Sequence, residues 1–180
     1  MLNKKRTNMD YLKNIEEGGF IVERRESPKE LPAELLKRYK NIPLEYLSFL
    51  QQFKQITNQE DTSWFNSIED FDGETDTDFK WNDFELQSLE ALEDDEEETE
   101  KARNFWNNHI PILMSVTEYE YLAICLESSR YGEIVHGIEP EFEETTKICD
   151  NFEQLITLMK APLSNDHLKH FYENEKNASA

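Results

Sequence analysis

The chain has only two cysteines among its 180 residues, Cys125 and Cys149, and they do not form a CxxC pair. So low a count excludes a disulfide-stapled scaffold, and the missing CxxC spacing excludes the common structural zinc motifs. Cys125 lies inside the apolar run YLAICLE. We therefore expect two buried, reduced thiols with no catalytic role, as is typical of a cytoplasmic protein.

Long hydrophobic runs are also missing. No stretch of about 18 apolar residues occurs, so no transmembrane helix is predicted. The start of the sequence, MLNKKRTNMDYLKNIEE, has basic residues but no apolar segment behind them, which is not the pattern of a secretory signal. These two observations predict a cytoplasmic protein with no membrane partner.

Basic residues are few: 19 Lys and Arg stand against 39 Asp and Glu, for a net charge of -20. Proteins that bind nucleic acid or anionic membranes need clusters of Lys and Arg, so both kinds of partner are excluded. The acids are concentrated in residues 69–100, where Lys80 is the only base. This asymmetry favours a basic protein as the partner.

Catalytic and nucleotide-binding motifs are absent too, among them GxGxxG, GxxxxGK[ST], GxSxG and HExxH. His167 and His170 are spaced for one helix face, but two histidines alone do not make a zinc site. The stretch DFDGETDTDF loosely resembles a calcium loop, yet Gly73 does not occupy the position that such a loop requires. We predict no enzyme activity, no cofactor and no metal site.

What the chain does contain is enough apolar and aromatic material for one core. Hydrophobic residues make up 37% of it, including 11 Phe, 7 Tyr and 3 Trp, and a domain of this length buries roughly 70% of its unfolded surface. Apolar periodicity predicts helices over 9–17, 27–40, 41–55, 82–109, 150–160 and 164–175. Runs rich in Ile, Val, Leu and Tyr predict strands within 62–71 and over 109–116, 118–127 and 132–139.

Short links between the last three strands require antiparallel neighbours. The expected fold is therefore α+β: a mostly antiparallel sheet flanked by helices in a single domain. Two helix boundaries stay open at this point, and one is predicted by a capping residue. Ser27 with Glu30 fits a capping box, although Pro32 could restart that helix. The run EDDEEETE over 93–100 is either a solvated helix face or an interruption between two helices, and Asp150 is expected to cap helix 150–160.

Candidate partner-binding residues form two groups. The first is a run of aspartates bracketed by aromatics, which are common anchors of interfaces. The second is a set of glutamates at strand ends, whose alternative role is to keep a sheet edge soluble. The first group comprises Trp64, Phe65, Asp70, Asp72, Asp76, Asp78 and Trp81, and the second comprises Glu118, Glu120, Glu139, Glu141, Glu143 and Glu144.

The order of these segments resembles the SUKH superfamily, which includes yeast regulators of cell-wall synthesis and many bacterial proteins. The resemblance runs from about Leu31 to Lys160 and rests on IPLEYLSFLQQF, the following WF and EDF, IPILMSVTEYEYLAICLE, YGEIVHGIEPEFEETTKIC and NFEQLITLM. Members often have glycine before the strand that matches YEYLAI, whereas this chain has SVTEYEY. The expected organisation is an N-terminal helical extension over 1–26, the α+β domain over 27–160 with an acidic insert over 69–100, and a C-terminal helix and tail over 161–180.

For bacterial members the resemblance implies an immunity protein, a cytoplasmic antidote that binds a toxin domain, in many cases a nuclease. The charge supports this independently, because a nuclease presents Lys and Arg to phosphate and an acidic protein can occupy that surface. The alternative, suggested by the yeast relatives, is a regulatory or scaffolding module with a non-toxin partner.

Overall fold

The computed structural model describes residues 10–138 and 141–172, and of residues 141–143 it describes the backbone alone. These residues form an antiparallel sheet whose seven strands follow one another in the order of the chain. The predicted α+β class, with an antiparallel sheet flanked by helices in a single domain, is confirmed. The strands are β1 (Ile21–Arg24), β2 (Phe53–Thr57), β3 (Ser63–Phe65), β4 (His109–Ser115), β5 (Glu120–Cys125), β6 (Ile134–Ile138) and β7 (Glu141–Cys149).

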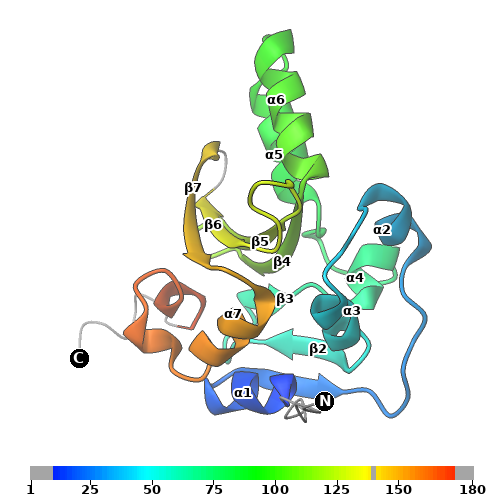
Figure 1. Cartoon of the computed structure of the whole chain (residues 1–180), viewed down its shortest axis with the longest axis vertical. Helices are drawn as coiled ribbons and strands as arrows, with labels where there is room; N and C mark the ends of the chain where they lie inside the picture. The colour runs from blue at the N-terminus through cyan, green and yellow to red at the C-terminus, as the bar shows by residue number, and fades with distance from the viewer. Residues whose placement is uncertain (1–9, 139–140, 173–180) are drawn as a thin grey trace, which may run out of the picture.

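The two faces of the sheet are covered by different helices (Figure 1). One face packs on α1 (Tyr11–Glu17), α3 (Leu44–Leu50) and α7 (Phe152–Leu158). The other face packs on a hairpin of α5 (Asp83–Ala91) and α6 (Glu96–Asn107), whose far end projects from the body of the molecule. Successive residues of β5 show the division, since Leu122 and Ile124 join the first core while Tyr121 and Ala123 join the second.

The three strands predicted between 109 and 139 are present as β4, β5 and β6. Every residue of β4 and β5 is buried, as expected for strands that are covered on both faces. The strand predicted within 62–71 is also confirmed as β3, and the chain then enters the short helix α4 (Ile68–Asp72).

The helix predicted over 41–55 was too long, because α3 ends at Leu50 and residues 53–57 form β2. Phe53 and Ile56 are three residues apart, which fits one face of a helix but not one face of a regular strand. A register shift in the β1–β2 ladder next to Phe53 allows both side chains to enter the first core. Pairing decides the outcome, since β2 forms ladders with both β1 and β3 and buries Phe53 and Ile56 completely.

The helix predicted over 27–40 is also shorter than expected. α2 (Ala33–Arg38) begins directly after Pro32 and residues 27–32 form no helix, so the capping box at Ser27 was wrong and the helix starts only after the proline. Segment 82–109 likewise forms two helices, because the Asp95 side chain accepts hydrogen bonds from the backbone N–H groups of Glu97 and Glu98 and so starts α6.

Two further strands were not predicted. β1 lies within 1–26, where only helix was expected, and β7 occupies the glutamate-rich segment after β6. The C-terminal helix expected over 164–175 was wrong in its described part, which begins at the end of the 3-10 turn Pro162–Ser164 and contains the 3-10 turn Lys169–Phe171. Helix α7 is capped by Asn151 rather than by Asp150.

No helix in the described ranges combines the length and the apolar composition that crossing a membrane requires.

Both cysteines are free thiols inside the fold. Burial raises the pKa of Cys125, and it raises the pKa of Cys149 to about 11. The Cys149 thiol also donates a hydrogen bond to the carbonyl oxygen of Asn151, 3.4 Å away. Neither thiol is therefore prepared to act as a nucleophile.

We expect thiol-specific reagents to label the native protein slowly at pH 8, because a pKa of about 11 leaves about one Cys149 thiolate in a thousand at that pH. Labelling should accelerate as the pH rises towards 10. Ellman's reagent measures this, and the same protein in urea should release two thiols rapidly. Rapid labelling of the folded chain, or a mass two hydrogens lower than that of the reduced chain, would contradict the assignment.

Candidate functional site

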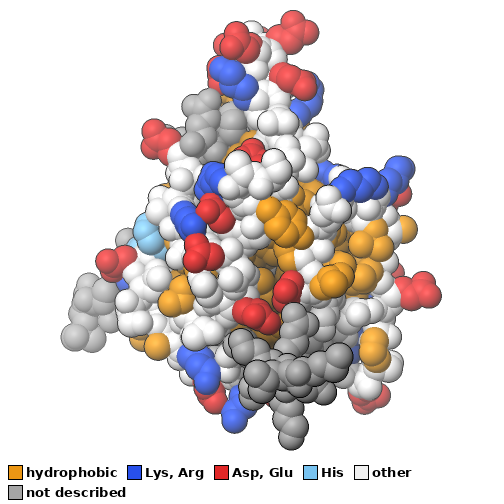
Figure 2. Space-filling model, in the orientation of Figure 1, with side chains coloured by type: hydrophobic (Ala, Val, Ile, Leu, Met, Phe, Trp, Pro, Cys, Tyr) orange, Lys and Arg blue, Asp and Glu red, His pale blue; other side chains and the backbone are white. Residues whose placement is uncertain are grey.

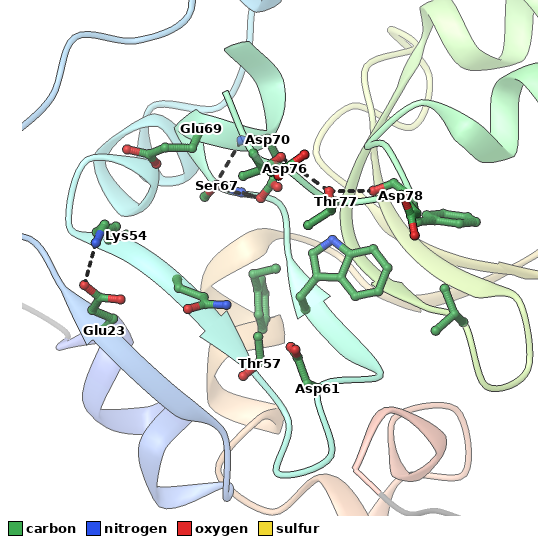
Figure 3. Close-up of a pocket in the computed structure, with 16 residues that line it drawn as sticks. Glu23, Lys54, Thr57, Asp61, Ser67, Glu69, Asp70, Asp76, Thr77 and Asp78 are labelled. Carbon is green, nitrogen blue, oxygen red and sulfur yellow. Dashed lines mark hydrogen bonds and ion pairs between the residues drawn. The ribbon is translucent and has the colours of Figure 1, made fainter. Parts of the chain in front are cut away.

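Part of the second sheet face is left uncovered by the α5–α6 hairpin. There the face of β1, β2 and β3 and the loop over 74–79 enclose a groove of about 510 Å³, which we call the acidic groove (Figure 3). Its carboxylates come from both sides: Glu23, Asp61, Glu69 and Asp70 from the strands, their hairpin turn and α4, and Asp76 and Asp78 from the loop. Among the residues that the structure describes, Lys54 is the only lysine or arginine that lines it.

Three of these carboxylates already have structural partners. Glu23 accepts a hydrogen bond from Lys54 at 2.9 Å, and Glu69 is paired with Arg25 and with Lys29. Burial by itself would raise the pKa of Glu69, but the hydrogen bond from Arg25 and the nearby positive charges outweigh it and lower that pKa. Asp70 closes a capping box, accepting from the backbone N–H and the hydroxyl of Ser67, both at 2.7 Å.

The other three carboxylates of the groove are different. Within the described residues Asp61, Asp76 and Asp78 take part in no ion pair, and all three are exposed. Figure 3 shows Asp76 and Asp78 on one side of the groove and Asp61 on the other. Their negative charges are therefore available to a ligand or partner from both rims.

The groove also has an aromatic wall. Trp64 on β3 is half-buried and packs edge-to-face on Phe79 of the loop, with ring centroids 5.9 Å apart. Its indole N–H donates to Oδ1 of Asn66 at 3.2 Å, which fixes the ring orientation. An aromatic surface next to unpaired carboxylates suits a partner that offers both apolar and cationic groups.

Of the remaining members of the first predicted group, Phe65 lines the groove from within the core, whereas Asp72 and Trp81 do not line it. The side chain of Phe65 is only 1% exposed, so the expectation of an exposed anchor was wrong for this residue. Asp72 lies outside the groove lining, 3.8 Å from Lys29. Trp81 also lies outside it, packing on Phe71 and beneath the guanidinium of Arg38.

Arg38 in turn makes a two-pronged ion pair with Glu85 at 2.7 and 2.8 Å, so Trp81 belongs to a contact that joins α2 to α5. Trp81 therefore helps to hold α2 against α5 and is not an exposed anchor for a partner.

Members of the second predicted group meet on the opposite sheet face. Glu118, Glu120 and Glu144 line a cavity of about 390 Å³ together with His136 and His167. Glu120 is 2% exposed and therefore not the surface residue that was expected. Glu139 lies outside the described residues. Glu141 and Glu143 lie at the start of β7, and of residues 141–143 only the backbone is described.

Sequence reasoning missed Asp61 and Phe79 in the groove and His136 beside Glu120. Asp61 lies in the turn between β2 and β3 with a φ of 56°, a left-handed conformation that aspartate tolerates in tight turns. Predicting β2 as a strand would have exposed this hairpin and its aspartate. No group of three or more His, Cys, Asp or Glu side chains within the described part of the chain is arranged to hold a metal ion.

The architecture is thus an α+β domain built on an antiparallel meander, with an open acidic groove beside a helical hairpin. A sequence profile of the SMI1 / KNR4 family (SUKH-1) matches residues 28–158. The chain therefore belongs to this family, as its resemblance to the SUKH superfamily predicted. Searches of curated proteins and of solved structures returned no match.

The family match begins after α1 and β1. These two elements are nevertheless built into the fold, because Leu12 and Ile15 of α1 enter the first core and β1 pairs with β2.

Proposed function

We propose that this protein is a non-enzymatic, immunity-type binding protein of the cytoplasm, whose acidic groove receives a basic surface of a toxin domain. Membership of the SMI1 / KNR4 family supports an immunity or regulatory role. The observation that carries the proposal is the set of unpaired carboxylates, Asp61, Asp76 and Asp78, on both rims of an uncovered groove with an aromatic wall.

The physical case has two parts. The net charge of -20 draws a basic partner from a distance, and such attraction raises association rates by roughly 10- to 1000-fold at low salt. Short-range contacts then set the lifetime of the complex, which is where half-buried aromatics contribute. A toxin domain that handles nucleic acid would present Lys and Arg of the kind that Asp61, Asp76 and Asp78 can neutralise.

The projecting end of the hairpin is the obvious competing surface, because acidic side chains surround it in Figure 2. There the acids are interspersed with bases, and Lys101 contacts both Glu97 and Glu98. Such local pairs reduce the charge that is left for a partner, which favours the groove.

Neutralising the groove should slow association with the basic partner by about tenfold at low salt and flatten its salt dependence, with little change in dissociation. The test variant combines Asp61→Asn, Asp76→Asn and Asp78→Asn. The candidate partner is a basic polypeptide encoded beside this gene. It is expressed in cells alone and together with the full chain of this protein. Growth rescue in cells and association rates by stopped flow are the two measurements.

The matched control combines Glu90→Gln, Glu93→Gln and Asp94→Asn near the hairpin end, all exposed residues. It removes the same charge, so the association rates of the two variants should differ only if the interface lies at the groove. If both variants slow association equally, net charge alone explains the effect and the groove is not the interface. A partner that is neither basic nor toxic would favour a regulatory role instead.

A further inference from the structure

A buried carboxylate lies in the second cavity, on the sheet face opposite the acidic groove. The cavity is formed by the ends of β5, β6 and β7 and by the turn that follows the first 3-10 helix. Strand register brings Glu120 opposite Ile138 and places Leu122 opposite His136, so Glu120 and His136 are diagonal neighbours on one face.

Only half of the Glu120 carboxylate is satisfied. Its Oε2 lies 2.6 Å from Nε2 of His136. Its Oε1 is buried and accepts no hydrogen bond from any described residue. Burying an acceptor without a donor is costly, and more so for a carboxylate. The site is therefore short of one hydrogen-bond donor.

The surroundings define the charge of the missing donor. Glu118, Glu144 and Asp166 also line the cavity, and of these Asp166 is paired with Lys169 at 2.9 Å. No lysine or arginine lines the cavity among the described residues. A cationic group would meet several carboxylates there, and Lys169, which pairs with Asp166, does not itself line the cavity.

The rings indicate the shape of the missing donor. His136 and His167 lie with ring centroids 5.2 Å apart, and both line the cavity. A guanidinium is planar, donates in pairs to a carboxylate and stacks on aromatic faces. A metal ion is a poorer match, because no described group of side chains has the arrangement of a metal site.

We propose that this cavity binds the guanidinium of an arginine side chain, which donates to Oε1 of Glu120 and stacks on the imidazole of His167. Because Oε1 is buried, binding must include a rearrangement of the side chains around it. The proposal is independent of the groove and its partner, since a different face of the sheet and different residues carry it.

The test uses the full chain, isotopically labelled, titrated at pH 7.5 with N-acetyl-arginine N-methylamide and followed by NMR. The expected result is a saturable shift of backbone signals around Glu120 and His136 and of the His136 and His167 ring signals. A single side chain should bind with a dissociation constant on the order of millimolar. The isosteric, uncharged citrulline analogue should leave these signals in place. Equal shifts with both compounds, or unsaturable shifts spread over the acidic surface, would overturn the proposal.

Glu120→Gln should weaken arginine binding at least tenfold, because it removes the charge while keeping the size of the side chain. Glu93→Gln near the end of the α5–α6 hairpin lines neither the cavity nor the acidic groove, removes the same charge and should leave binding unchanged. If Glu120→Gln does not fold, the exposed rim pair Glu118→Gln and Glu144→Gln should weaken binding several-fold in a folded protein. Weakening by Glu93→Gln to the same extent as by the cavity variants would show a general charge effect and refute a built site.

Discussion

Replacing Trp106 with alanine should lower the free energy of unfolding by roughly 3–5 kcal/mol, the usual cost of removing a buried tryptophan. Trp106 is 1% exposed and packs on Tyr121 of the sheet with ring centroids 5.0 Å apart. Its indole N–H donates to the hydroxyl of Ser88 on α5, and its carbonyl accepts from Tyr39. One side chain thus joins both hairpin helices to the sheet, at the centre of a second core that also contains Phe84, Met114 and Tyr121.

Urea unfolding followed by fluorescence and by circular dichroism measures the effect. The control is Leu86→Ala on the exposed side of α5, which should change stability by no more than about 0.5 kcal/mol. A loss below about 1 kcal/mol for Trp106→Ala would mean that the hairpin does not share in the cooperative unfolding of the domain.

Replacing Trp64 with alanine should speed dissociation of the basic partner by about 30- to 700-fold, which corresponds to roughly 2–4 kcal/mol for an interface anchor. This prediction rests on the proposed groove interface. Trp64 is half-buried against Phe79 and forms the aromatic wall of the groove. Association should change little, because the carboxylates on the rims remain in place.

Trp81→Ala is the matched control, since Trp81 lies outside the groove lining and packs on Phe71 and Arg38. It should lower the melting temperature and leave the dissociation rate of the partner unchanged. An unaltered dissociation rate for a folded Trp64→Ala protein would place the interface elsewhere, with the strand-end residues Glu118 and Glu144 as the next candidates.

Local signals in the sequence were strong for the centre of the sheet. Strands β4, β5 and β6 are apolar runs with short links, and antiparallel pairing is the only geometry that such links permit. The first group of candidate residues was equally visible, because Trp64, Asp70, Asp76 and Asp78 lie close together in the chain. The structure places these four around one groove.

Other features depended on partners distant in the chain. Residues 53–57 satisfy helical spacing, yet they form β2 because β1 and β3 supply its hydrogen bonds. The polar segment of β7 carries no alternating apolar pattern and is held by its ladder to β6. The hydrogen bonds of such a ladder join main-chain groups, so they do not require an alternating pattern of apolar side chains in the sequence.

By itself the sequence determined the fold class, the family and the acidic character of this protein, because periodicity, chain links and composition are local properties. Tertiary structure alone decided which carboxylates act together and which are buried. Asp61 and Asp76 reach opposite rims of one groove only after β2 and β3 pair and the loop over 74–79 folds back. Glu120 has the same chemistry as Glu118, but Glu118 lies exposed in the turn before β5, whereas Glu120 lies on the strand and is buried beside His136. Alternation along a strand selects two faces, and only the packing of the whole chain determines which of them meets water.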